Sequence, residues 1–321
     1  MEPKVYITDC DHEHIEYETK ILEKNEIEFE LKQCKTEEDL IKNCQGASVL
    51  INQYAPITRE VLQALSDVKL VVRYGVGVNN VDLDVASELG VQVCNVPDYG
   101  TQEVADHALA FMLAFTRGIY KMVKGVKEGE WNYQHAVPLF RHSKQTVGVI
   151  GLGRIGAAFA QKASALGCRV IAYDPKYDQE KQNRMPEFVE YKSFEDLLTE
   201  SDVISIHCPL DRAQNLIGAD ELKKMKNNAY LINVSRGGII NEEALEQALV
   251  NKDIAGAAVD VLEKEPVAKD HPILKLDNFL CTPHMGWYSE QAAVELKEKV
   301  ALEAVRFLQG EPVHYPVNDL K

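Results

Sequence analysis

Residues 146–156 read Thr146-Val-Gly-Val-Ile150 followed by Gly151-Leu-Gly-Arg-Ile-Gly156, and this stretch decides the fold. The first five residues predict a buried strand, and the run from Ala157 predicts a helix that begins directly after the glycines. The first glycine permits a tight turn, the second lets backbone N–H groups approach a pyrophosphate, and the third lets the helix pack closely on the strand. We therefore expect this loop to bind a dinucleotide at the N-terminus of the helix. The expected contact residues are Gly151, Leu152, Gly153, Arg154, Ile155 and Gly156.

The next predicted strand ends in Tyr173-Asp174, shortly beyond the glycine loop. An acid at about this distance accepts hydrogen bonds from a ribose diol, whereas it would repel a 2′-phosphate. Asp174 therefore predicts NAD rather than NADP as the cofactor. The alternative is that Asp174 is simply a turn residue before Pro175.

Short β-branched runs alternate with helical patterns along the whole chain. The expected strands before residue 100 are Val5–Thr8, Phe29–Leu31, Val49–Ile51, Leu70–Arg73 and Val91–Cys94. One long helix is expected over Thr101–Lys127, the alternation restarts at Thr146, and a helix over Ser289–Gln309 follows. Because such alternation builds parallel sheets with helices on both faces, the sequence predicts two doubly wound α/β domains. The 321 residues and the apolar content of 45% are sufficient for two cores.

The charge balance argues against two classes of partner. Lys and Arg number 35 against 50 Asp and Glu, so the net charge of −15 repels nucleic acid and anionic membranes. The longest apolar run, Ala108–Phe115, is too short to span a bilayer, and no basic region precedes an apolar N-terminal segment. We expect a soluble cytoplasmic protein.

The cysteines and histidines predict no metal site. The seven cysteines are scattered without a C-x-x-C pair, which is typical of free thiols in a reducing compartment. His12 and His14 are two residues apart, so on a helix they would not face each other.

Three predicted strands are each followed by a polar residue of a different kind. Arg236 lies in Ser235-Arg-Gly-Gly238, Glu265 follows Val259-Asp-Val261, and His284 follows Phe279-Leu-Cys-Thr282. Ligands of open α/β sheets bind beyond the carboxyl ends of the strands, so we expect these side chains to share a crevice. Hydride transfer at a carbinol carbon needs a proton donor, a group that holds the substrate anion and a group that orients the imidazole. Taken singly, each residue has an ordinary alternative as a helix cap, a solvent-facing acid or a turn histidine.

Six motifs occur in order along the chain: Arg73-Tyr-Gly-Val-Gly-Val-Asn-Asn-Val-Asp82, Cys94-Asn-Val-Pro97, Gly151–Gly156, Asn233-Val-Ser-Arg-Gly-Gly238, Asp260-Val-Leu-Glu-Lys-Glu-Pro266 and Thr282-Pro-His284. Together they resemble the D-isomer-specific 2-hydroxyacid dehydrogenase family. The resemblance implies that Arg236 binds the substrate carboxylate and 2-oxo group, that His284 is the acid/base, and that Glu265 hydrogen-bonds His284.

The resemblance also implies further ligand contacts. The backbone of residues 75–77 would hold the substrate carboxylate, and Asp260 would contact the nicotinamide amide. The expected substrate-contact residues are Arg73, Tyr74, Gly75, Val76, Gly77 and Trp287. The further expected cofactor-contact residues are Cys208, Pro209, Val234, Ser235, Asp260 and Gly286.

The family's domain organisation gives the expected boundaries. A flavodoxin-like substrate domain would comprise residues 1–100 and 285–321, and a Rossmann nucleotide domain residues 101–284, with an interdomain active site and hinge closure. Similar proteins dimerise through the nucleotide domain, which here points to the region from Thr101 to about Gln145. The apolar run Ala108–Phe115 fits that use, although a buried core helix would look the same.

Three functions compete. The leading one is an NAD-dependent reductase of short 2-oxo acids such as glyoxylate, hydroxypyruvate or pyruvate. Trp287-Tyr-Ser-Glu-Gln291 together with Arg73 looks most like the C-terminal-binding-protein branch, which suggests an NADH-sensing corepressor as the alternative. The corepressors have extended N- and C-terminal tails that these 321 residues do not show, so we expect the corepressor alternative to be the weaker one. The third function, a short-form phosphoglycerate dehydrogenase, needs a basic phosphate site, for which only Arg73 and Arg141 are apparent.

Overall fold

The computed structural model describes residues 4–176 and 186–320. These residues form two compact units, of which unit 1 comprises the chain up to Gly100 and from Ser289 onward, and unit 2 comprises Thr101–Tyr288. The boundary expected at residue 285 therefore falls four residues later. Met285 and Gly286 stay with unit 2 because their amides donate hydrogen bonds to Asp260, at 3.0 and 2.7 Å.

Unit 1 has a five-stranded parallel sheet in the order β2-β1-β3-β4-β5 among the described residues. Its strands are β1 (Val5–Ile7), β2 (Phe29–Leu31), β3 (Val49–Asn52), β4 (Leu70–Arg73) and β5 (Gln92–Cys94). Its helices are α1 (Glu16–Lys24), α2 (Glu37–Asn43), α3 (Arg59–Ala64), α4 (Leu83–Glu88) and α12 (Glu290–Leu308). This strand order is the flavodoxin-like one, as the sequence predicted.

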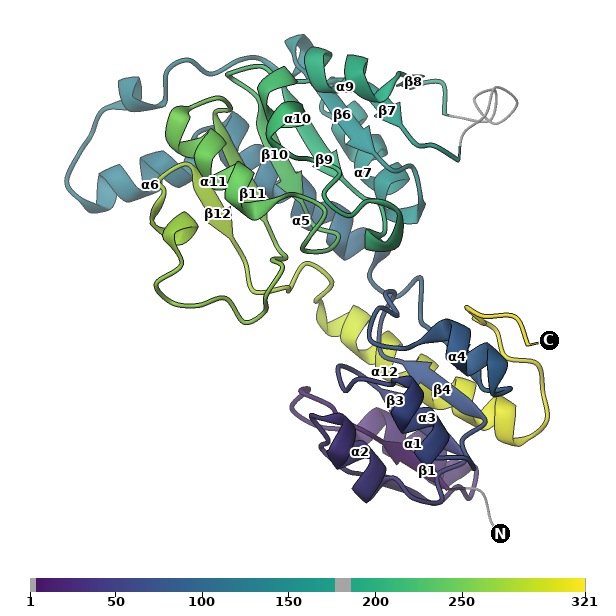
Figure 1. Ribbon diagram of the computed structural model, residues 1–321. Helices are drawn as coiled ribbons and strands as arrows, with labels where there is room; N and C mark the ends of the chain where they lie inside the picture. The colour runs from purple at the N-terminus through teal and green to yellow at the C-terminus, as the bar shows by residue number, and fades with distance from the viewer. Residues whose placement is uncertain (1–3, 177–185, 321) are drawn as a thin grey trace. The chain divides into compact units, whose positions relative to one another are not determined.

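Both faces of the unit 1 sheet are covered. Apolar side chains of α2, α3 and α4 form one core cluster with the strands, and α12 contacts α1, β3 and β4 (Figure 1). Because helices cover both faces of the sheet, Val49–Asn52 is buried throughout. Strands buried on both faces are apolar at successive positions, as Val49-Leu-Ile51 is.

Unit 2 has a seven-stranded parallel sheet in the order β12-β11-β10-β9-β6-β7-β8. Its strands are β6 (Thr146–Ile150), β7 (Arg169–Tyr173), β8 (Val189–Tyr191), β9 (Val203–Ile206), β10 (Tyr230–Asn233), β11 (Gly256–Val259) and β12 (Phe279–Cys281). Its helices are α5 (Thr101–Thr116), α6 (Ile119–Lys127), α7 (Arg154–Ala165), α9 (Phe194–Glu200), α10 (Ala219–Lys224) and α11 (Glu242–Asn251). Short 3-10 helices lie at Tyr133–Ala136, His142–Lys144, Leu210–Arg212 and Pro272–Lys275. The strand order reverses between β6 and β9, which makes this point the switch at which such sheets bind ligands.

Two apolar clusters sandwich the unit 2 sheet. One lies beneath α9, α10 and α11, and the other beneath α5 and α7 (Figure 1). Both predicted doubly wound sheets are therefore confirmed. The burial fixes the sheet rigidly, so the loops at its carboxyl edge have a firm base.

The helix expected over Thr101–Lys127 is wrong in one respect, because it is broken into α5 and α6. Gly118 adopts a left-handed conformation with φ of 63°, and its amide donates to the carbonyl of Phe115 at 2.9 Å, which ends α5. The apolar periodicity continues across this break, so periodicity alone did not reveal it.

Candidate active site

The three glycines of the loop between β6 and α7 have different surroundings. A Cβ on Gly151 would lie 2.8 Å from the carbonyl oxygen of His207, and one on Gly156 would lie 1.9 Å from that of Gly151. Among the described residues, no heavy atom lies within 4 Å of the position that a Cβ on Gly153 would take. Packing therefore explains the first and third glycines, whereas the second leaves open space at the N-terminus of α7. This space, next to a helix N-terminus, fits a dinucleotide pyrophosphate.

Asp174 lies directly beyond the end of β7 and contacts the glycine loop. Its two carboxylate oxygens accept hydrogen bonds from the amides of Leu152 and Lys176, both at 2.9 Å. Each oxygen retains a lone pair for a ribose hydroxyl, and the negative charge would oppose a 2′-phosphate. Asp174 therefore lies against the glycine loop, and its role as a ribose ligand stays a prediction.

His284 and Glu265 form a close pair. The Nδ1 of His284 is 2.6 Å from Oε2 of Glu265, and the other oxygen of Glu265 accepts the amide of Leu262 at 2.9 Å. Burial raises the pKa of the Glu265 carboxyl, but the hydrogen bond and charge of His284 outweigh burial and leave that pKa below its usual value. An ionised Glu265 requires Nδ1 to be the protonated nitrogen that it faces, which leaves Nε2 of His284 as the ring nitrogen that can exchange a proton.

Arg236 lies on the neighbouring loop after β10. Its carbonyl accepts a hydrogen bond from Asn233 at 2.9 Å, and its Nη1 donates to the carbonyl of Ser235 at 2.7 Å. A Cβ on Gly237 would lie 2.1 Å from the backbone of Leu262, so this loop packs directly against the loop of Glu265. The positive charge of Arg236 is also one of the influences that lower the pKa of Glu265. The three predicted catalytic residues thus lie at one edge of the unit 2 sheet.

Asp260 has a different environment from the one expected of a simple cofactor contact. Its buried carboxylate accepts hydrogen bonds from Thr282 Oγ1 at 2.5 Å and from the amides of Met285 and Gly286. Its carbonyl accepts the amide of His284 at 2.9 Å. Asp260 therefore ties down the loop that carries His284, and its contact with nicotinamide stays a prediction.

The other expected cofactor residues lie at the same sheet edge. Cys208 and Pro209 follow β9, which borders the switch point, and Val234 and Ser235 follow β10, the neighbouring strand. The hydroxyl of Ser235 donates to the carbonyl of Ile206 at 2.9 Å and so ties these two loops together.

In unit 1, the expected substrate residues lie at the carboxyl end of β4. Gly75 has φ of 114°, and Nη1 of Arg73 lies within 2.1 Å of the position that a Cβ on Gly75 would take. Val76 is 40% exposed. The side chain of Tyr74 is buried and donates to Glu18 at 2.7 Å, so the expectation of a substrate contact is corrected to its backbone alone. In unit 2, the ring of Trp287 packs edge-on against Tyr288 with centroids 5.5 Å apart.

A residue near this site that the sequence analysis did not single out is His107 on α5. Its Nε2 is 2.9 Å from Oγ1 of Thr282, two residues before His284. The available signal was a histidine, next to Asp106, within the apolar helical run that contains Ala105, Ala108 and Met112.

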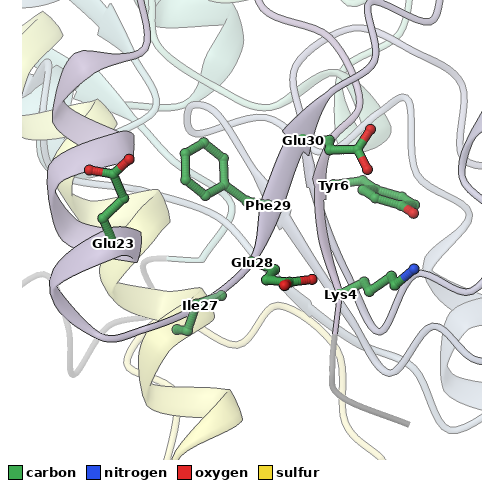
Figure 2. A pocket seen from close by; sticks show the side chains of 7 residues that line it. All are labelled: Lys4, Tyr6, Glu23, Ile27, Glu28, Phe29 and Glu30. Atoms are coloured by element: carbon green, nitrogen blue, oxygen red, sulfur yellow. The ribbon is translucent and has the colours of Figure 1, made fainter.

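A hollow in unit 1 lies away from this carboxyl edge. It has a volume of 340 Å³ and is lined by Lys4, Tyr6, Glu23, Ile27, Glu28, Phe29 and Glu30 (Figure 2). Lys4 precedes β1, and Glu28 precedes β2, so the hollow lies at the amino ends of parallel strands, opposite the edge where such sheets bind ligands.

The described residues lack two other kinds of feature. Across residues 4–176 and 186–320, no helix is both long and apolar enough to cross a membrane. The same residues contain no group of three His, Cys, Asp or Glu side chains arranged to hold a metal ion.

Comparison with known proteins identifies the family. Residues 109–286 match the family model described as D-isomer specific 2-hydroxyacid dehydrogenase, NAD binding domain. The chain is 34% identical to a glyoxylate reductase of Korarchaeum cryptofilum, over 97% of this chain and 94% of that protein. It is 37% identical to a D-3-phosphoglycerate dehydrogenase of Archaeoglobus fulgidus over 92% of this chain, but spans only 56% of that longer relative.

A solved structure agrees with the sequence matches. The D-lactate dehydrogenase of Aquifex aeolicus, complexed with NAD and lactic acid, superposes with a TM-score of 0.86 at 26% identity, covering 96% of each chain. The matched family model covers more than half of the chain, including the glycine loop, Arg236, Glu265 and His284. The chain therefore belongs to the D-isomer specific 2-hydroxyacid dehydrogenase family, and unit 2 contains its NAD-binding domain.

Proposed function

We propose that this protein reduces a short 2-oxo acid to the D-2-hydroxy acid with NADH. The observation that carries the proposal is the 2.6 Å pair of His284 and Glu265 beside Arg236, at the same sheet edge as the glycine loop. A structural histidine needs no ionised partner at a ligand-facing edge, whereas a proton donor does.

The residues divide the chemistry among them. Arg236 forks onto the substrate carboxylate with two parallel N–H donors. Nε2 of His284 gives its proton to the 2-oxo oxygen, and Glu265 stabilises the imidazolium that exists before this transfer. The nicotinamide of bound NAD supplies or takes up the hydride. The backbone of the glycine loop and Asp174 hold the cofactor.

The relatives suggest which acids the protein reduces. The named relatives include a glyoxylate reductase and a D-lactate dehydrogenase, so glyoxylate, pyruvate and hydroxypyruvate are the first acids to test. In unit 1, we propose that Arg73 and the backbone at Gly75–Gly77 bind carboxylate, and in unit 2 that Trp287 forms an apolar wall. One methylene in such a pocket changes discrimination by only about 1–3 kcal/mol, so several acids should react.

A panel of 2-oxo acids with NADH tests the proposal, with loss of NADH absorbance as the readout. We expect turnover with at least one short acid. Tight NADH binding without turnover on any acid would contradict the proposal and favour an NADH-sensing binding protein. The basis of that alternative is the likeness of Arg73 and Trp287 to the C-terminal-binding-protein branch. Turnover confined to 3-phosphoglycerate, assayed in the oxidative direction, would favour the third function.

We further propose that a second copy of this chain covers an apolar surface between α6 and β6. None of the residues of α6 is buried, and Trp131, Tyr133 and Val137 are 91, 77 and 62% exposed. Apolar side chains clustered to this degree mark interaction surfaces. Sedimentation equilibrium should show a dimer that Trp131→Glu weakens, whereas Val250→Glu on α11, also exposed, should not. A wild-type monomer at every concentration would refute the dimer.

A further inference from the structure

His107 reaches from α5 to the loop that carries His284. Its Nε2 is 2.9 Å from Oγ1 of Thr282 and 3.6 Å from Oδ1 of Asp260. The ring also packs edge-on against Phe111, with centroids 4.7 Å apart, and the side chain is 19% exposed. The ring is thus held between a core helix and the catalytic loop.

The hydrogen bonds of Thr282 determine which partner donates the proton between Thr282 and His107. The Thr282 hydroxyl has one proton, and at 2.5 Å from the carboxylate of Asp260 it donates that proton to Oδ1. The same hydroxyl oxygen is therefore an acceptor toward His107. Nε2 of His107 must carry a proton, so the chain of donors runs from His107 through Thr282 to Asp260.

Asp260 hydrogen-bonds the backbone of His284 and of the two residues that follow it. Its carboxylate accepts the amides of Met285 and Gly286, and its carbonyl accepts the amide of His284 itself. His284 has φ of 51°, a conformation that a non-glycine residue keeps only where its surroundings enforce it. A Cβ on Gly286 would lie 2.9 Å from Asp260 and 3.3 Å from the ring of His107, so the loop is packed directly on these two side chains.

We propose that His107 is a positioning residue whose Nε2 proton, through Thr282 and Asp260, fixes the catalytic loop and hence the direction of the His284 imidazole. The proposal rests on the proposed function only in that His284 is taken as the proton donor. The hydrogen bonds that link His107, Thr282 and Asp260 exist in the protein without ligand, so their effect can be measured there.

Two substitutions at the same position separate the donor from the packing. His107→Gln keeps an N–H donor at similar reach, and His107→Leu keeps apolar volume without a donor. We expect His107→Leu to lower kcat about 10- to 100-fold, since small misplacements of catalytic groups cost this much, with an unchanged Kd for NADH. His107→Gln should recover most of kcat.

Hydrogen exchange of residues 282–288 in the ligand-free protein gives a readout that needs no activity. Exchange of this segment should accelerate in His107→Leu and remain near wild type in His107→Gln. Wild-type kcat and exchange in His107→Leu would overturn the proposal, as would equal losses in both variants, which would indicate packing alone. If wild type reduces no 2-oxo acid, the proposed function fails, while the exchange data still decide whether these hydrogen bonds fix the loop.

A double-mutant cycle tests the route of the coupling. Thr282→Val removes the hydroxyl between His107 and Asp260, and adding His107→Leu to it should cause little further change in kcat or exchange. Fully additive effects would show that His107 does not act through Thr282 and would refute the proposed chain of donors.

Discussion

Replacing Gly153 with alanine should leave the fold intact and weaken NADH binding. Gly153 has φ of −68° and ψ of −168°, which any residue adopts. In the part of the chain that the structure describes, the new methyl group would meet no atom within 4 Å. Alanine at such an unstrained position adds about 0.4–1 kcal/mol of stability by restricting the unfolded chain. We therefore expect the Tm of the ligand-free protein to stay equal or rise.

The same methyl group would stand where backbone amides must approach a pyrophosphate. Hydrogen bonds to charged groups contribute about 1.5–3 kcal/mol each. Losing one of them would raise the Kd for NADH about 10- to 150-fold. Titration of NADH fluorescence measures this change.

Gly156→Ala provides the matched control in the same loop. Its new Cβ would lie 1.9 Å from the carbonyl oxygen of Gly151, so the backbone itself must move. Overpacking of this kind costs about 1–3 kcal/mol, which lowers the Tm by about 2–12 °C for a unit of this size. Calorimetry of both ligand-free variants separates the two effects. A wild-type Kd for NADH in Gly153→Ala would refute the assignment of the loop to the pyrophosphate.

Three further substitutions test the remaining groups. Arg236→Gln should raise the KM for the oxo acid and lower kcat, whereas unchanged steady-state kinetics would remove Arg236 from the site. Asp174→Ala should lower the ratio of NADH to NADPH efficiency, and an unchanged ratio would exclude a ribose role. The pKa of Glu265 in the folded protein lies below its usual value of 4.5. Glu265 therefore stabilises the fold at pH values above 4.5, and this stabilisation is lost as the pH falls through the lowered pKa. Urea unfolding at acidic pH should therefore show a shallower decline in Glu265→Gln than in wild type, and identical declines would contradict the stated cause of the shift.

The nearness of Arg236, Glu265 and His284 to one another could be predicted from the sequence for a simple geometric reason. Arg236, Glu265 and His284 follow β10, β11 and β12, whose carboxyl ends meet at one edge of a parallel sheet. Strand order therefore converts positions far apart in the chain into neighbours. The glycine loop and Asp174 were predictable for the same reason, since β6 and β7 are adjacent.

Other features depend on contacts that no local pattern encodes. The bond between His107 and Thr282 joins positions 175 residues apart, and His107 lies outside all six motifs, so nothing local connects it to the Thr282-Pro-His284 motif. Tyr74 precedes a glycine motif, yet its side chain points into the core because Glu18 on α1 offers a buried acceptor. The break at Gly118 interrupts a periodic apolar run without changing its period.

The role of His284 as the proton donor is tested most directly by His284→Ala, measured for both turnover and cofactor binding. Removal of a general acid should cut kcat about 10²- to 10⁴-fold on the best 2-oxo acid. The Kd for NADH should stay at the wild-type value, because the glycine loop and Asp174 are untouched. A His284→Ala protein that retains full kcat would contradict the account.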